Sequence, residues 1–472
     1  MKNKKKADSG ISRRKFLGMS AAGLTGLTIL PSYVMSNGVR VAPSDRVVVG
    51  FIGLGQQGLN DFGSFAGVPG VQVVAGCDVD SMKNVRFKRR VEEWQASQGM
   101  PQRCDTYEHY EEMLERTDID AVAIATPDHW HALNTIHACQ TGKDVYVQKP
   151  LSFTIKEAME IERVARDTNR VVQVGSQQRS SGEFQKAIEL VQTGAIGHIE
   201  KIYAKVGDPP APFDLPKEQV PANLNWNKWI GPLHDDNFHY NSDLCPPISI
   251  DPPADEQLWG AWRWYREVGN GFTADWGAHM FDIAQAAIGM DGSGPSEIIP
   301  KGYGNNEYLA FKYLNGIVMT EQPYLEDMPN AQGVKFFGTD GWIEVGRGYL
   351  GSSNEDLVPE DLAGNRPRQM TQEERRAMFA AMQAARDAGG GSFEISSPHM
   401  QNFIDCVRSR KTPIASVEVG ASTSITCCLG NIATELQRPV VWNPATRKFV
   451  DDPEAANHRL THYEYRNPYK LS

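Results

Sequence analysis

The sequence predicts an α/β protein: an N-terminal Rossmann domain with a doubly wound parallel sheet, then a C-terminal α/β domain with an open, mainly antiparallel sheet. Two observations predict the first domain. Apolar runs of strand length alternate with helix-like segments from residue 46 to about residue 176, and the first run ends in a glycine-rich turn. The second domain is predicted by strand-like segments that follow one another closely, at Tyr308–Tyr313, Gly316–Gln322, Gly333–Gly338 and Gly341–Val345.

Length, charge and cysteine content limit the classes of protein to consider. The chain has 472 residues, enough for two or three domains with an ample core. Its formal net charge is −10 and the charges are mixed along the chain, so we expect no nucleic-acid partner. The seven cysteines form no C-x-x-C pair. We therefore expect buried thiols and no metal site, in preference to a zinc centre or a disulfide framework.

Residues 1–36 are separate from the predicted fold. S-R-R-K-F-L at residues 12–17 follows a basic start and precedes an apolar, small-residue run that ends at Leu30. This pattern matches a twin-arginine export signal, and the alternative is a chance arginine pair in a tail. The apolar run is short for a bilayer and no other segment is long enough. We therefore expect an exported, periplasmic protein whose mature chain has no membrane span.

The first strand leads into V-V-V-G-F-I-G-L-G-Q-Q-G at residues 47–58. Gly53, Gly55 and Gly58 follow the G-x-G-x-x-G spacing of dinucleotide-binding turns. The first glycine permits a tight turn, the second lets a pyrophosphate approach the backbone, and the third lets the next helix pack against the strand. The start of that helix offers free N–H groups and a positive dipole end to the phosphates. By itself the triplet also occurs in plain turns.

The residue at the end of the second strand supports the dinucleotide interpretation. V-Q-V-V-A-G-C at residues 71–77 is followed by Asp78, twenty positions after Gly58. A carboxylate at this place accepts hydrogen bonds from the adenosine ribose. It also repels a 2′-phosphate, so the sequence favours NAD over NADP as the cofactor.

The remaining segments extend this domain over residues 44–177. We expect helices at 81–98, 107–116, 131–140 and 155–168, and strands at 120–126, 144–147 and 171–174. Ligands of such sheets bind beyond the carboxyl ends of the strands. The predicted cofactor contacts are Gly53, Gly55, Gln56, Gln57, Gly58, Asp78, Thr126, Pro127, Asp128, His131, Gln148, Lys149 and Gln177. For Asp128, helix capping is an equally good interpretation.

Residues 178–445 form the predicted second domain, and residues 446–472 a C-terminal tail. We expect helices at 183–193, 272–289, 399–408 and 417–436, a strand at 199–206, and a helix-like part at 372–388 within a polar stretch. Residues 207–262 are irregular and rich in Pro, Asn, Asp and Trp. Irregular segments of this length are usually functional or lid-like.

Five motifs together resemble the Gfo/Idh/MocA oxidoreductase family, which includes glucose–fructose oxidoreductase and inositol dehydrogenase. They are G-F-I-G-L-G-Q-Q-G, A-T-P-D-H-W-H-A, V-Y-V-Q-K-P-L, G-S-Q-Q-R-S and A-D-W-G-A-H-M-F-D-I-A, and the resemblance runs over roughly residues 46 to 445. It implies NAD(P)-dependent chemistry on sugars, polyols or glycosides. It also implies a homo-oligomer, because the open sheet of this family often mediates assembly.

The residues suited to the chemistry are Lys149, Asp275 and His279. Lys149 ends a strand before Pro150, which favours an extended backbone and permits a cis bond, and its ammonium can stabilise a developing negative charge. Asp275, His279 and Asp282 would share one helix face at i, i+4 and i+7. Histidine suits base catalysis, although a buried, hydrogen-bonded histidine is the alternative. The family pattern D-x-x-x-H is met by Asp275 and His279, so the resemblance implies catalytic roles for these two and Lys149.

The substrate contacts are less constrained by the sequence. Trp276 can stack on a sugar ring, and Tyr265 belongs to the segment that could close the site. The candidates are Lys149, Arg179, Tyr265, Asp275, Trp276 and His279. The chain departs from the family at Gln148, where the family usually has Glu before the Lys-Pro pair, so an expected charge is absent.

Three functions remain open. The first is an NAD-dependent oxidoreductase acting on a sugar, polyol or glycoside hydroxyl, with a tightly bound cofactor because free NAD is scarce outside the cytoplasm. The second is an NAD-dependent glycosidase that removes hydride, eliminates the leaving group and returns the hydride. The third is a non-catalytic NAD- or carbohydrate-binding protein, since a fold alone does not establish catalysis.

Overall fold

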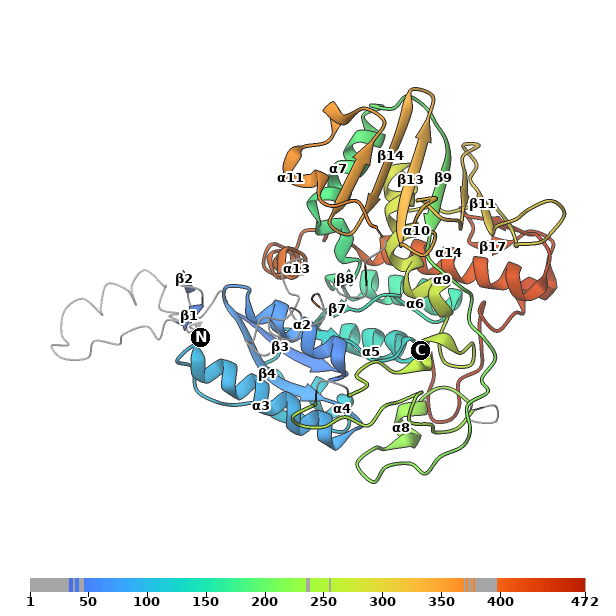
Figure 1. The fold of residues 1–472 in the computed structure, drawn as a ribbon. Helices are drawn as coiled ribbons and strands as arrows, with labels where there is room; N and C mark the ends of the chain where they lie inside the picture. The colour runs from blue at the N-terminus through green and yellow to red at the C-terminus, as the bar shows by residue number, and fades with distance from the viewer. Residues whose placement is uncertain are drawn as a thin grey trace, which may run out of the picture.

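The computed structural model describes residues 34–36, 39–41 and 46–471, apart from 235–237, 254–255 and most of 369–396. Two large sheets with their helices form the body of the molecule (Figure 1). The first described strands, β1 (Val34–Ser36) and β2 (Val39–Val41), pair only with each other. The predicted export signal lies almost wholly outside the described residues, as does the helix expected at 372–388 apart from isolated positions.

The first sheet is the predicted parallel sheet. Its strands are β3 (Val47–Ile52), β4 (Val71–Cys77), β5 (Asp105–Tyr107), β6 (Ala121–Ile124), β7 (Asp144–Val147) and β8 (Val172–Val174). They lie in the order β5-β4-β3-β6-β7-β8, and all neighbours are parallel. The direction of winding reverses between β3 and β6, so a crevice for a ligand is expected there. The sequence did not predict β5, which has only three residues.

Helices cover both faces of this sheet. They are α2 (Gln56–Ala66), α3 (Ser81–Ser97), α4 (Tyr110–Leu114), α5 (Asp128–Gln140) and α6 (Ile155–Asp167). Local signals define their starts: Asp80 caps α3, and Thr154 with Glu157 forms a capping box at α6. A late segment, α13 (Ser397–Ser409), completes one face, because its Met400, Phe403 and Ile404 join the cluster around Phe51.

The second sheet has nine strands in the order β15-β14-β13-β9-β12-β11-β10-β16-β17. Its strands are β9 (Ile199–Lys205), β10 (Glu297–Ile299), β11 (Ala310–Lys312), β12 (Val318–Thr320), β13 (Gly333–Gly338), β14 (Gly341–Gly346), β15 (Tyr349–Ser352), β16 (Val440–Asn443) and β17 (Lys448–Phe449). Among its described strands, only β9 and β12 pair in parallel, so the prediction of a mainly antiparallel sheet is confirmed.

Helices α7 (Gly182–Gln192), α10 (Gly277–Ala287) and α14 (Val417–Leu436) accompany this second sheet. Of these, α14 packs against both α10 and α6, so it joins the two halves of the molecule (Figure 1). Shorter helices are α8 (Trp226–Ile230), α9 (Gly271–Asp275), α11 (Glu360–Ala363), α15 (Pro453–Ala456) and 3₁₀ turns at Gln177–Ser180, Ala261–Trp264 and Glu355–Leu357.

Two expectations need correction. The helix expected at 272–289 is two helices, α9 and α10, because the chain bends at Trp276. The segment interpreted as a tail is packed: Leu460 O accepts a hydrogen bond from Ile155 N at 2.9 Å, and Tyr465 donates to the buried Glu157 at 2.5 Å. The end of the chain therefore packs against the start of α6 and is hydrogen-bonded to it. This helix follows the predicted catalytic lysine.

The irregular segment returns to the Rossmann domain. In Figure 1 its short helix α8 lies beside α4 and α5, away from the second sheet. Ser81 N donates to Asn223 O at 2.9 Å, and Asn223 donates to Asp80 at 2.7 Å. The segment thus covers the carboxyl-terminal edge of the first sheet instead of extending into solvent.

All seven cysteines are buried and free, as expected. Within the described part of the chain, no group of His, Cys, Asp or Glu side chains is arranged to hold a metal ion. No described helix has the length and apolar character needed to cross a membrane.

Candidate active site

The glycine turn after β3 opens into a cavity of about 140 Å³ at the carboxyl ends of β3, β4 and β6. One wall is formed by Gly53, Gly55 and Asp78. The opposite wall comes from the irregular segment, between Cys245 and Arg263. The site thus has the position that the reversal of strand order predicts for a dinucleotide.

The three glycines differ in the space around them. Gly53 has φ +86°, and a Cβ there would lie 2.6 Å from Ala125 C. A Cβ on Gly58 would lie 2.1 Å from Gly53 O, so the helix could not pack so closely. A Cβ on Gly55 would meet nothing within 4 Å. This open space, beside a start of α2 that has no side-chain cap, fits a pyrophosphate.

Asp78 is fixed at the far end of this cavity. Its Oδ2 accepts a hydrogen bond from Leu54 N at 2.8 Å, and its Oδ1 accepts one from Asp80 N at 2.9 Å. Lys83 lines the same cavity. Burial would lower the pKa of Lys83, but the negative charge of Asp78 outweighs it and the pKa is raised. The ribose end of the cavity therefore has both a carboxylate and an ammonium group.

A second cavity, of about 430 Å³, adjoins the first. Both cavities are lined by Gln57, Ala125, Thr126, Trp259, Trp262 and Arg263. The second cavity brings together Lys149, Asp275 and His279, which come from the end of β7, the end of α9 and the start of α10. The predicted catalytic residues thus meet beside the predicted cofactor site.

Lys149 and Asp275 form a close ion pair. Lys149 Nζ donates to Asp275 Oδ1 at 2.6 Å and to Asp275 O at 2.9 Å. The Lys149–Pro150 peptide bond is cis. Burial opposes ionisation of Asp275, but Lys149 and Arg263 outweigh it and lower the pKa of the carboxyl group. The Asp275 carboxylate is therefore ionised at neutral pH, and Lys149 lines the cavity beside it.

His279 is buried between Gln178 and Arg347. With the Gln178 amide oxygen facing the guanidinium, it accepts hydrogen bonds from Arg347 Nη2 and Nε at 2.8 and 2.9 Å. The amide nitrogen then donates to His279 Nδ1, and Arg347 Nη2 lies 3.4 Å from His279 Nε2. Burial, followed by the charges of Lys149 and Arg347, lowers the pKa of His279 well below its usual value. The imidazole is therefore neutral at pH 7.

Gln148 faces a buried carboxylate. Its Nε2 donates to Oδ1 and Oδ2 of Asp61, both at 2.9 Å, and Gln57 also donates to Asp61 at 2.8 Å. Burial raises the pKa of Asp61 to about 7, although these hydrogen bonds oppose the rise. The carboxylate absent from position 148 is thus replaced by one directly behind it.

Other predicted contacts lie around the same two cavities. Gln56 and Pro127 line the first cavity, whereas Asp128, His131 and Gln177 line the second. The N-cap of α5 is Pro127, so Asp128 is the first helical residue and not the cap. Burial raises the pKa of Asp128 to about 7, against the opposing charge of Lys149.

His131 connects the two strand ends that carry the site. Its Nδ1 lies 2.6 Å from Pro150 O, and its Nε2 lies 2.9 Å from Thr126 O. Burial lowers the pKa of His131 to about 4. The ring therefore joins the end of β6 to the turn after Lys149, which fixes the position of the lysine.

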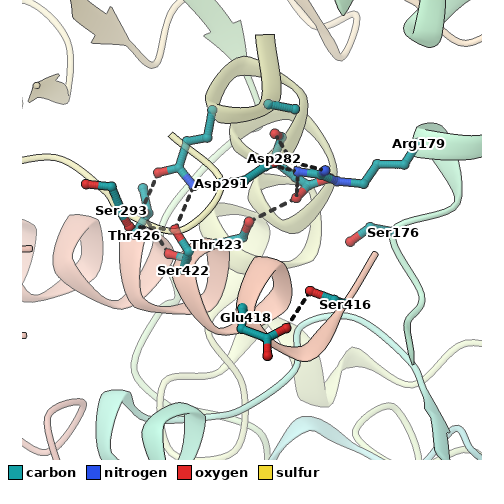
Figure 2. A network of polar contacts seen from close by, with 12 residues as sticks. Ser176, Arg179, Asp282, Asp291, Ser293, Ser416, Glu418, Ser422, Thr423 and Thr426 are labelled. Atoms are coloured by element: carbon teal, nitrogen blue, oxygen red, sulfur yellow. Dashed lines mark hydrogen bonds and ion pairs between the residues drawn. The ribbon is translucent and has the colours of Figure 1, made fainter. Parts of the chain in front are cut away.

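Two residues expected near the substrate, Arg179 and Tyr265, lie elsewhere, and Asp282 does not have its expected position. Arg179 is buried and paired with Asp282 at 2.7 Å and with Asp291 at 2.5 Å, in the network of Figure 2. Asp282 therefore faces this network, and the bend at Trp276 places Asp275 in a different helix from His279 and Asp282, so the three do not share one helix face. Tyr265 lines neither cavity and packs against Phe213, with ring centroids 5.2 Å apart.

Comparison with known proteins agrees with this architecture. Residues 47–176 match the model of a family described as an oxidoreductase family with an NAD-binding Rossmann fold, GFO_IDH_MocA. Its N-terminal domain thus matches the Gfo/Idh/MocA oxidoreductase family. The match covers the domain that contains the glycine turn, Asp78 and Lys149.

Two curated relatives of the chain are glycosyl hydrolase family 109 proteins. One, from Shewanella pealeana, is 30% identical over 209 residues, which is 40% of this chain and 44% of the relative. Another, from Shewanella sp. strain ANA-3, is 26% identical over 264 residues, which is 52% of this chain and 55% of the relative. The alignments span about half the length of these relatives.

Solved structures share the fold along most of the chain. A levoglucosan dehydrogenase in complex with NADH and levoglucosan has a TM-score of 0.53 at 17% identity, covering 87% of this chain and 100% of the other. The WlbA dehydrogenase from Bordetella pertussis, in complex with NADH and UDP-GlcNAcA, has a TM-score of 0.54 at 14% identity, covering 84% and 98%. At these identities the similarity establishes the fold alone.

Sequence reasoning missed four groups of site residues. Gln178 stands beside the predicted Gln177 within a family motif, so the motif itself could have indicated it. Trp259, Trp262 and Trp264 stand in the irregular segment, whose tryptophan content was a usable signal. No local signal marks Arg347 or Asp61, because a distant segment brings the first to the site and Asp61 lies within an ordinary helix.

Proposed function

We propose that this protein is an NAD-dependent oxidoreductase that acts on a hydroxyl group of a sugar, polyol or glycoside and holds its cofactor tightly. The observation that supports the proposal is the meeting of Lys149, Asp275 and His279 in a cavity continuous with the one at the glycine turn. A hydroxyl placed there would have an acid, a base and a hydride acceptor within reach.

The residues that line the first cavity support NAD as the cofactor. Gly55 leaves room for a pyrophosphate near the uncapped start of α2, and Asp78 is placed to accept ribose hydroxyl groups. The carboxylate supports NAD over NADP, because it repels a 2′-phosphate. Leu258, Trp259 and Trp262 of the irregular segment cover the same cavity, which supports slow release of the cofactor.

NAD would supply the hydride acceptor, and the protein would handle the proton. Lys149 uses two hydrogen bonds on Asp275, so its third N–H is available to the reacting oxygen. For His279 to accept the hydroxyl proton at Nε2, its own proton must lie on Nδ1. Gln178 then has to turn so that its oxygen accepts that Nδ1–H. We therefore assign Gln178 as the residue that sets the histidine tautomer.

Glycoside cleavage with no net oxidation is a second candidate. It needs a group that protonates the leaving oxygen, and Asp128 lines the cavity with a pKa raised by burial to about 7. A carboxyl group with that pKa is partly protonated at neutral pH. The names of the curated relatives, glycosyl hydrolase family 109, support this candidate.

One experiment separates these functions. The purified protein is denatured and its released nucleotide identified by mass spectrometry, and the native protein is then mixed with polyols, sugars and aryl glycosides. Reduced nicotinamide that forms with a sugar or polyol supports the oxidoreductase. Phenol release without net reduced nicotinamide supports the glycosidase. A protein that arrives without nucleotide, and shows neither signal when NAD is added, would contradict both.

We also propose export and self-association. The N-terminal arginine pair supports export, and replacing Arg13 and Arg14 by lysine should keep the protein in the cytoplasm when cell fractions are compared. One face of the nine-stranded sheet presents Tyr203, Phe337 and Trp342 beside Lys201 and Lys335, which supports an interface between copies. A monomer in light scattering would contradict that.

A further inference from the structure

The substrate cavity has more cationic than anionic groups. Lys149, Arg263 and Arg347 line it, against the carboxyl groups of Asp275 and Asp128. Asp275 is already bound to Lys149, so it does not neutralise the two arginines at hydrogen-bonding distance. A positively charged cofactor ring in the adjoining cavity would increase this excess. An uncharged sugar would leave the imbalance in place.

Of the three cations that line the cavity, Arg347 is the one for which the described residues provide no ion pair. It stands in the turn between β14 and β15, and its Cζ lies 4.6 Å from the ring centroid of Trp276. Nε and Nη2 are turned toward Gln178, which carries no charge. Nη2 also lies 3.4 Å from His279 Nε2. Among the described residues, no group accepts a hydrogen bond from Nη1. The guanidinium is held in place and retains donors for a ligand.

Arg263 differs from Arg347 because other groups of the protein already surround its guanidinium. Its Nη1 donates to Gly260 O at 2.7 Å, and its Nε lies 3.8 Å from Asp275 Oδ1. The rings of Trp262, Trp259 and Trp264 surround it at 4.5, 5.3 and 5.7 Å. This arginine therefore joins the aromatic wall to Asp275, and the excess charge is concentrated at Arg347.

We propose that the substrate is an acidic sugar whose carboxylate binds Arg347, with the sugar ring against Trp276. The inference rests on the proposed function in taking this cavity as the sugar site. Guanidinium groups bind carboxylates through paired, charge-assisted hydrogen bonds. Contact with the ring of Trp276 fixes the plane of the Arg347 guanidinium for such a pair. Such a contact orients the ring, so that a chosen hydroxyl faces Lys149 and His279.

Binding of matched sugar pairs to the protein as purified tests the proposal. Each pair is a methyl glycoside and its uronic acid, in the gluco, galacto and manno series, measured by calorimetry at low and high salt. At least one uronic acid should bind about tenfold or more tightly than its neutral partner, and salt should reduce the difference. Equal affinity in every pair, or no binding of any uronic acid, would overturn the proposal.

Variants locate the contact. Arg347→Gln should remove the preference for the acid, lowering its affinity about tenfold or more. Arg163→Gln, at an exposed arginine of α6 paired with Glu160 and Asp167, should not alter it. If Arg347→Gln keeps the preference, the proposal is wrong. Binding of a sulfated sugar with exclusion of every uronic acid would also overturn it.

These outcomes are independent of whether the protein is an oxidoreductase. Calorimetry measures binding, so an acid-selective cavity without hydride transfer would contradict the proposed function and leave this inference intact. Hydride transfer to neutral sugars with no preference for acids would support the proposed function and contradict this inference.

Discussion

Lys149 and Asp275 are 126 positions apart in the chain, yet the lysine donates to both the carboxylate and the backbone carbonyl of the same aspartate. The first residue lies two positions beyond a strand of the Rossmann sheet, and the second ends a helix of the other domain. Two hydrogen bonds to one residue fix the ammonium in direction as well as in distance. The catalytic cavity is thus assembled across the boundary between the two domains.

Replacement of Lys149 by methionine should abolish most of the hydride transfer. The variant lacks the group that stabilises negative charge on the reacting oxygen, so the rate should fall roughly 10²- to 10⁴-fold. Stopped-flow formation of reduced nicotinamide measures this rate. Lys156→Met, at an exposed lysine near the start of α6, is the matched control. A Lys149→Met protein that reacts at the wild-type rate would exclude the assigned role.

Substitution of Gln178 tests the control of the histidine tautomer. Gln178→Glu provides an acceptor for His279 Nδ1–H and a charge for Arg347, so it should keep activity and shift the pH profile of hydride transfer. Gln178→Met provides neither and should lose roughly 10- to 100-fold in rate. The measurement is the pH dependence of single-turnover rates. Identical profiles for both variants and the wild type would show that Gln178 does not act on His279.

Substitutions at the buried pair of Gln148 and Asp61 should have opposing effects on the free energy of unfolding. Gln148→Glu alone places a second carboxyl group 2.9 Å from Asp61, which should cost on the order of 2 kcal/mol of the free energy of unfolding at pH 8. Adding Asp61→Asn restores one donor and one acceptor side chain and should recover most of that loss. Denaturant unfolding of the four proteins completes the cycle, and additive effects would contradict direct pairing.

The same aspartate predicts a pH dependence of stability. Its pKa is raised from 3.8 to about 7 in the folded protein, so the native state binds more protons than the unfolded state between these values. Its contribution to stability is therefore lost as pH rises from about 4 to about 7, by at most about 4 kcal/mol. Asp61→Asn should remove this slope. Comparison of the two unfolding curves across this range cancels the contributions of other groups.

The glycine turn predicts two different outcomes for the same substitution. Gly58→Ala places a methyl group 2.1 Å from Gly53 O, so it should lower the free energy of unfolding by about 1–3 kcal/mol. Gly55→Ala meets no atom within 4 Å and should fold normally. The methyl group would occupy the space for the pyrophosphate, so the amount of bound NAD should fall about tenfold or more. Thermal unfolding and nucleotide content measured side by side distinguish the two effects.

Much of the fold could be predicted because its signals are local. The glycine spacing, the apolar strands 47–52 and 71–77, and the helix at 417–436 all depend on residues close together in sequence. Short strands such as β5 and β17 were missed because three or fewer residues leave no detectable period. The bend at Trp276 was missed because the apolar pattern continues through it.

The sequence by itself determined the chemistry that is available: a dinucleotide turn, an acid after the second strand, and Lys149, Asp275 and His279 as reactive groups. Only the tertiary structure decided which of these groups meet. It paired Lys149 with Asp275, directed Arg179 to Asp282, and brought Arg347 from a distant hairpin to the cavity. The physical reason is that strand and helix patterns depend on neighbouring residues, whereas a side-chain pair is fixed by how separate elements pack.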